Sequence, residues 1–132
     1  MIEVKKAEDA IKLAKHKIRS WDKEHLIGLY LDSKNNLKHS ELISMGLLDS
    51  TLLAPREILQ PAILYSSAGF VLLHNHPSGD VKPSKEDIAE TLRIEKASKI
   101  MGILFIDHII FSKGKIYYSM RANKKMKGGE KL

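Results

Sequence analysis

The 132-residue sequence contains no cysteine. Disulfide bonds, thiol nucleophiles and zinc sites with thiolate ligands are therefore excluded. No apolar run approaches the ~20 residues that a membrane-spanning helix requires. The first residues, MIEVKKAEDA, also lack the apolar stretch of a secretory signal. We therefore expect a cytoplasmic protein with no membrane association.

Aromatic residues are scarce at 6%, whereas hydrophobic residues reach 43% and charged residues 29%. This balance is typical of a globular domain, and the length suits one domain with a single core. The net charge of +6 is concentrated in residues 121–132, which hold five basic residues against one acidic residue. A basic end of this kind can contact phosphates without sequence preference. We expect a single domain over residues 1–120 and a basic, flexible tail over 121–132.

Hydrophobic periodicity predicts helices interspersed with strands. Helices are expected over residues 7–19, 55–64 and 84–101, and strands over 25–32, 37–46, 68–76, 103–112 and 115–120. The segments 25–32 and 68–76 are apolar at nearly every position, as in strands that are covered on both faces. The pattern therefore predicts an α/β fold in which helices cover a mixed central sheet.

Residues 74–87, HNHPSGDVKPSKED, gather several groups that can carry chemistry. Side chains at i and i+2 of a strand point to one face, so His74 and His76 aim together where Pro77 ends the strand. Two neutral imidazoles suit a metal ion, and without cysteine a third ligand must be His, Asp or Glu. Asp87, at the start of the next helix, can complete a His–His–Asp set. The fourth position of a zinc ion would then hold a water whose pKa the metal lowers.

A simpler interpretation exists for part of this segment. The letters SKED have the S-x-x-D form of a capping box, and Ser84 and Asp87 taken alone favour helix capping. His74 and His76 have no comparable structural explanation, because apolar side chains would fit a buried strand better. The ordered combination is therefore more informative than any one fragment.

The spacing of these residues resembles a known family. His74-x-His76, seven residues, Ser84, two residues and Asp87 resemble the motif H-x-H-x(7)-S-x(2)-D of the JAMM (MPN+) zinc metalloproteases. The phrases KEHLIGLYLDSKNNL, PREIL, HNHPSGDVKPSKED and DHIIF resemble its RadC branch in matching order. The resemblance covers residues 22–120. It implies a cytidine-deaminase-like α-β-α sandwich, one Zn²⁺ ion and hydrolysis of an amide or isopeptide bond in a peptide or protein substrate.

The resemblance also implies a role for each matching residue. His74, His76 and Asp87 match the zinc ligands, and Ser84 matches the residue that stabilises the oxygen of the tetrahedral intermediate. Glu24, in KEHLIGLYL, matches the glutamate that moves a proton from water to the leaving amine. Glu41 is the second candidate for this proton-transfer role, to be tested in place of Glu24.

Other polar residues receive weaker interpretations. Asn75 should point to the opposite face from its neighbours and form hydrogen bonds with the backbone of a loop. A Ser78 nucleophile has no identifiable orienting partner. Asp107 and His108 could support a ligating imidazole, but alternation along their strand favours edge or end positions. Three further histidines show no ligand spacing and are interpreted as ordinary: His16, His25 and His39.

Three functions follow from these observations. The first is a zinc-dependent metallohydrolase, and the second is a metal-binding domain without catalysis. The third is a DNA-associated module, because the RadC family carries a DNA-repair label. The sequence lacks the N-terminal helix-hairpin-helix region of longer members, and no aromatic residues interleave with basic ones as in single-strand binders. Base deaminase signatures with P-C-x-x-C, and the H-E-x-x-H signature, are absent.

Overall fold

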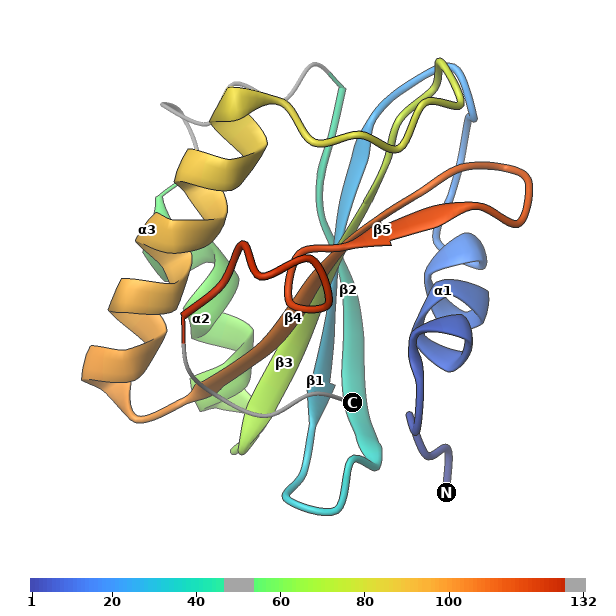
Figure 1. Ribbon diagram of the computed structural model, residues 1–132. Helices are drawn as coiled ribbons and strands as arrows, with labels where there is room; N and C mark the ends of the chain where they lie inside the picture. Colours follow the sequence, from blue (N-terminus) through green and yellow to red (C-terminus); the bar gives the residue numbers. More distant parts are fainter. Residues whose placement is uncertain (47–53, 128–132) are drawn as a thin grey trace.

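The structure is a computed structural model that describes residues 1–46 and 54–127. The described residues form three helices and five strands in an α-β-α arrangement (Figure 1). In chain order they are α1 (Ala7–Lys15), β1 (His25–Leu31), β2 (Leu37–Met45), α2 (Pro55–Leu64), β3 (Gly69–Asn75), α3 (Lys85–Met101), β4 (Leu104–Phe111) and β5 (Tyr117–Ser119). The expected α/β class is confirmed. Helix α1 ends at Lys15, four residues before its predicted end at residue 19, because the chain turns there to enter β1.

The strands form one mixed sheet in the order β2-β1-β3-β4-β5. Strands β3 and β4 are parallel, and the other neighbouring pairs are antiparallel. Helix α3 is the crossover connection that a parallel pair requires. This connection leads the chain from the end of β3 through a loop into the first turn of α3. The carboxyl end of β3 and the amino end of α3 therefore lie next to each other.

The sheet is covered on both faces, as Figure 1 shows with α1 on one side and α2 and α3 on the other. All seven residues of β1 and all seven of β3 are buried, which confirms the prediction from their continuous apolar sequences. Alternate residues of β1 and β3 pack into two hydrophobic clusters, one on each face of the sheet. Toward α2 and α3 lie Leu26, Tyr30, Phe70 and Leu72, and toward α1 lie Ile27, Leu29, Val71 and Leu73. The period of two thus sends His74, two residues after Leu72, toward α3.

Local signals explain where the helices begin and end. Pro55 is the first residue of α2, where its missing N–H would have no partner. Ser84 caps the start of α3, and its side chain accepts a hydrogen bond from the Asp87 N–H. Gly102 ends α3 with φ 72°, a left-handed conformation that glycine adopts without strain. No described helix has both the length and the apolar character needed to cross a membrane.

The described part of the C-terminal segment packs against the domain, contrary to the expected flexible tail that begins at residue 121. Arg121 and Met126 are buried. The guanidinium of Arg121 donates hydrogen bonds to the Ile106 carbonyl at 2.7 Å and the Phe105 carbonyl at 2.9 Å. Glu95 on α3 accepts a hydrogen bond from the Lys127 N–H at 2.7 Å. Residues 121–127 therefore belong to the folded domain, and residues 128–132 lie outside the described residues.

We expect Arg121→Ala to lower the free energy of unfolding by about 2–4 kcal/mol, because the buried carbonyls of Phe105 and Ile106 lose charged donors. Lys125→Ala, an exposed lysine in the same segment, should change it by less than about 0.5 kcal/mol. Urea denaturation followed by circular dichroism measures both values. Equal midpoints for the two variants would show that this segment does not stabilise the domain.

Candidate metal centre

The end of β3 presents two imidazoles to the same space. His74 is the sixth residue of β3, and His76 extends the ladder when its N–H donates to the Phe111 carbonyl at 3.1 Å. Their Nε2 atoms lie 2.9 Å apart, which confirms that the two side chains aim together. The Nδ1 atom of each ring faces away from this point. Nδ1 of His74 contacts Nε2 of His108 at 2.8 Å, and Nδ1 of His76 donates to the Asp80 carbonyl at 2.8 Å.

The turn after His76 brings the chain back toward these rings. Gly79, with φ 88°, donates its N–H to the His76 carbonyl, and this tight turn places the Asp80 carbonyl against the His76 ring. Ser78 Oγ accepts a hydrogen bond from the Asp80 N–H at 3.2 Å, a contact that stabilises the turn. The loop therefore orients His76.

The first turn of α3 supplies a carboxylate to the same point. Ser84 and Asp87 form a reciprocal capping box: Ser84 Oγ accepts from the Asp87 N–H at 3.0 Å, and Asp87 Oδ2 accepts from the Ser84 N–H at 2.8 Å. The same carboxylate lies 3.4 Å from His74 Nε2 through Oδ1 and 3.3 Å from His76 Nε2 through Oδ2. The Asp87 side chain therefore caps α3 and faces the two histidines at the same time.

The geometry of these three residues fits a small cation. One atom from each of His74, His76 and Asp87 lies within 4.8 Å of the other two. Ligands at zinc distances in a tetrahedral site are about 3.4 Å apart, close to the two imidazole–carboxylate distances of 3.4 and 3.3 Å. The His74 side chain is 2% exposed, whereas those of His76 and Asp87 are 14% and 19% exposed. The group is thus closed on the His74 side and open to solvent on the other.

The electrostatics favour the metal-binding protonation states of His74 and Asp87, whereas the hydrogen bond with Asp87 raises the pKa of His76, which must lose a proton to bind metal. Burial, together with the nearby His108, lowers the pKa of His74 well below its ordinary value. Burial alone would raise the pKa of Asp87, but the hydrogen bond to His76, the proximity of His74 and the contacts with Ser84 outweigh it and hold this pKa well below its usual range. At neutral pH His74 is therefore neutral and Asp87 is ionised, as metal ligands must be.

The position of Glu24 follows from contacts of its neighbours. Asn75 points to the opposite face from the two histidines, as expected, and its Oδ1 accepts from the His25 N–H at 2.7 Å. Its Nδ2 donates to the Lys23 carbonyl at 2.9 Å. Asn75 thus holds the residues on both sides of Glu24 against the end of β3. The charge of Glu24 contributes to a raised pKa of His76, after a larger effect of the hydrogen bond with Asp87, so this carboxylate lies within electrostatic range of the site.

Glu41, the substitute for Glu24, has a different environment. It lies on β2 opposite Gly28, and its Oε1 contacts His39 Nε2 at 2.9 Å. The ring of His39 in turn stacks on Tyr65, with ring centroids 3.9 Å apart. Of the two acidic residues, only Glu24 contributes to the pKa shift of a candidate ligand, so Glu24 is the stronger candidate.

The favoured sequence interpretation of Asp107 and His108, as edge or end residues, is wrong, whereas the alternative, a contact with the imidazole of a candidate ligand, is found for His108. Both are buried in β4. Asp107 accepts hydrogen bonds from Ser119 Oγ at 2.5 Å and from the Arg121 N–H at 3.0 Å, so it joins β4 to the C-terminal segment. His108 contacts His74 directly. The only sequence signal for this contact is the histidine itself, since the register of a parallel pair depends on the crossover between the strands.

Comparison with known proteins gives consistent similarities. Residues 4–126 match the family described as RadC-like JAB domain. A UPF0758 protein of Methanococcoides burtonii is 44% identical over 118 residues, which cover 89% of this chain and 51% of that protein. A UPF0758 protein of Syntrophomonas wolfei is 47% identical over 106 residues, covering 80% of this chain and 44% of that protein. The chain spans about half the length of the curated relatives it matches.

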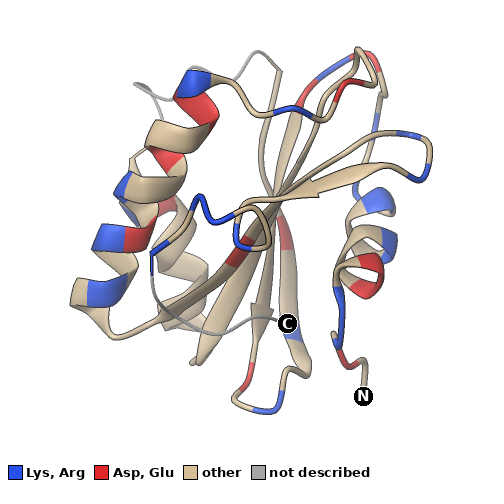
Figure 2. Cartoon of the chain, viewed as in Figure 1, with Lys and Arg blue, Asp and Glu red and all other residues tan. Residues whose placement is uncertain are grey.

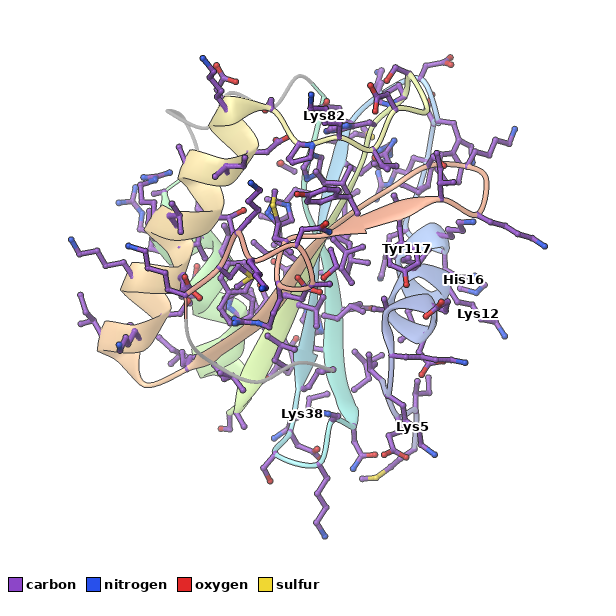
Figure 3. All side chains as sticks on the ribbon, in the orientation of Figure 1. Lys5, Lys12, His16, Lys38, Lys82 and Tyr117 are labelled. Atoms are coloured by element: carbon purple, nitrogen blue, oxygen red, sulfur yellow. The ribbon has the colours of Figure 1, made fainter. Side chains whose placement is uncertain are left out.

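We expect the purified chain to bind about one zinc ion and His76→Ala to bind none, because the substitution removes one of three converging ligands. His16→Ala is the matched control, since His16 directly follows α1 as its C-cap, on the other side of the sheet from α3 (Figure 3). Plasma mass spectrometry of dialysed protein measures the zinc content. Equal zinc in both variants would remove His76 from the metal site.

Proposed function

Because the chain belongs to the family of RadC-like JAB domains, we propose that it is a zinc-dependent hydrolase of peptide or isopeptide bonds. The observation that carries this proposal is the convergence of His74, His76 and Asp87 on one partly open point, with Glu24 within electrostatic range. A site for storing or carrying metal would need only the first three residues. The nearby carboxylate supports a catalytic use.

The set of ligand atoms favours zinc. Zinc accepts imidazole nitrogen and carboxylate oxygen, and its catalytic sites combine three protein ligands with an open position. The exposure of His76 and Asp87 gives that open position access to solvent and substrate. When bound, the ion would lower the pKa of a coordinated water and polarise the carbonyl of the scissile bond.

Glu24 would act as the proton carrier. Its carboxylate would accept a proton from the attacking water and deliver that proton to the leaving amine, as general acid–base catalysis requires. The contacts of Asn75 with the Lys23 carbonyl and the His25 N–H hold the backbone on both sides of Glu24. Because alternate residues of the strand face opposite ways, His74 and His76 would hold the metal while Asn75 positions the segment that contains Glu24.

Ser84 would stabilise the negative charge that develops on the carbonyl oxygen. Its Oγ already accepts a hydrogen bond from the Asp87 N–H. A serine hydroxyl has one proton and two lone pairs, so the capping contact leaves the proton available for donation. Capping and oxyanion stabilisation are thus compatible roles for one side chain.

We expect Glu24→Gln to retain zinc and to reduce hydrolysis about 100-fold or more, because the amide cannot carry a proton. Asp22→Asn makes the same change at an exposed residue nearby and should leave turnover unchanged. The assay is hydrolysis of a library of peptides and isopeptide-linked substrates, with a chelator control. Unchanged turnover in Glu24→Gln would remove Glu24 from the mechanism. Zinc binding without chelator-sensitive hydrolysis in the parent chain would favour a non-catalytic metal-binding domain.

The alternative of a DNA-associated module finds less support in the distribution of charge. Figure 2 shows Lys and Arg interspersed with Asp and Glu along α3 rather than gathered in a basic stripe. Affinity for a phosphate backbone requires several basic side chains that act together. We therefore expect no mobility shift of duplex or single-stranded DNA at about 0.15 M salt. A shift that persists when the exposed lysines of the C-terminal segment, Lys124, Lys125 and Lys127, are changed to alanine would favour the DNA-associated module.

A further inference from the structure

A continuous chain of hydrogen bonds runs behind the candidate metal centre. Nδ1 of His74 lies 2.8 Å from Nε2 of His108, and Nδ1 of His108 lies 2.6 Å from Oγ1 of Thr91. Thr91 Oγ1 in turn donates to the Asp87 carbonyl at 2.8 Å. The chain therefore begins at one candidate ligand on β3, passes through β4, and ends at the backbone of another candidate ligand on α3.

The direction of each hydrogen bond follows from elementary valence. The Asp87 carbonyl can only accept, so the single hydroxyl proton of Thr91 is donated to it. Thr91 Oγ1 must then accept from His108, which places a proton on His108 Nδ1. The bare Nε2 of neutral His108 accepts from His74 Nδ1–H.

The lone pair of His74 is consequently on Nε2, the atom that faces His76 and Asp87. It accepts a hydrogen bond from His76 Nε2 at 2.9 Å when the His76 ring is protonated, and it faces the metal position when that ring is neutral. The opposite assignment would need the Thr91 hydroxyl to donate to His108. In that arrangement two oxygen lone pairs, on Thr91 and on the Asp87 carbonyl, would face each other at 2.8 Å. The observed contacts thus select one tautomer for both rings.

Because its members are buried, this series of hydrogen bonds determines the tautomer of His74. Thr91 is 0% exposed, His108 3% and His74 2%. Water therefore has little access to replace a lost partner, and a side chain that loses its hydrogen bond stays unsatisfied. A free histidine in water can place its proton on either nitrogen, whereas a ligating nitrogen must be bare.

We propose that Thr91 and His108 are positioning residues that set the metal affinity of the site by fixing the tautomer and the ring orientation of His74. This inference rests on the proposed metal site at His74, His76 and Asp87. The same hydrogen bonds join the first turns of α3 to β3 through β4, so they also fix the distance between Asp87 and His74. Partners of this kind change metal affinity about 10–100-fold when they are removed.

Substitutions at Thr91 provide the first test. Thr91→Val keeps nearly the same shape and removes the hydroxyl, whereas Thr91→Ser keeps the hydroxyl and removes the methyl group. We expect Thr91→Val to bind zinc about 10–100-fold more weakly than the parent protein. Thr91→Ser should bind zinc within about threefold of the parent, because its hydroxyl still completes the series of hydrogen bonds. Competition with a chromophoric chelator measures both affinities, and urea midpoints verify that both variants fold.

Substitutions at His108 provide the conservative rescue. Glutamine can offer Oε1 to His74 Nδ1–H, whereas leucine offers no acceptor. His108→Gln should therefore recover part of the affinity that His108→Leu loses. The absorption spectrum of the Co²⁺-loaded chain should change in His108→Leu and Thr91→Val, since a reoriented imidazole alters the coordination geometry. If His108→Leu fails to fold, the Thr91 pair decides the question.

Nitrogen NMR of the histidine rings in metal-free protein separates this inference from the proposed function. The parent chain should show His74 with its proton fixed on Nδ1, and Thr91→Val should show a mixture of the two tautomers. A parent chain that has the fixed tautomer but binds no zinc would overturn the proposed function and leave the tautomer assignment standing. If the parent protein binds zinc, and Thr91→Val and His108→Leu bind it with the same affinity and show the same Co²⁺ spectrum, the positioning role of Thr91 and His108 is overturned.

Discussion

The reciprocal hydrogen bonds between Ser84 and Asp87 are the interaction on which the site depends. They form at the first turn of α3, where a helix has backbone N–H groups without partners. Asp87 accepts from the Ser84 N–H with one oxygen, which fixes the direction of its carboxylate toward the two histidines. Without this contact a flexible side chain on the surface of a helix would sample several rotamers. The motif that begins the helix therefore also orients a candidate ligand.

The second constraint is the alternation of side chains along β3. Three consecutive residues face in alternating directions, so His74 and His76 converge on one point while Asn75 turns to the other face. Asn75 uses that face to hold the segment that contains Glu24. The parallel pairing of β3 with β4 then brings His108 behind His74. A few residues at one strand end thus contact four separate parts of the chain.

Much of this arrangement is predictable from the sequence because its signals are local. Pro55 marks the start of α2, Gly102 marks the end of α3, and apolar runs mark β1 and β3. The spacing of His74, His76 and Asp87 predicts that they meet, since strand alternation and the short return loop bring them together. These predictions depend on residues that are close in the sequence.

The features that the sequence analysis missed, or gave only as a weaker alternative, depend on long-range register. His108 looks like an edge residue until the crossover through α3 fixes its position beside β3, and Thr91 carries no signal without that contact. Similarly, the charge of residues 121–132 predicts a solvated tail. Arg121 is nevertheless buried, because carbonyls of β4, 15 and 16 residues earlier, accept its hydrogen bonds. Composition does not reveal such distant acceptors.

The central claim is that the imidazoles of His74 and His76 and the carboxylate of Asp87 form the binding site of a single metal ion. A crystal grown with zinc and measured on both sides of the zinc absorption edge tests it most directly. The account predicts one strong anomalous peak, about 2.0–2.2 Å from Nε2 of both histidines and from one oxygen of Asp87. A structure from such a crystal with no peak among these three residues would contradict it.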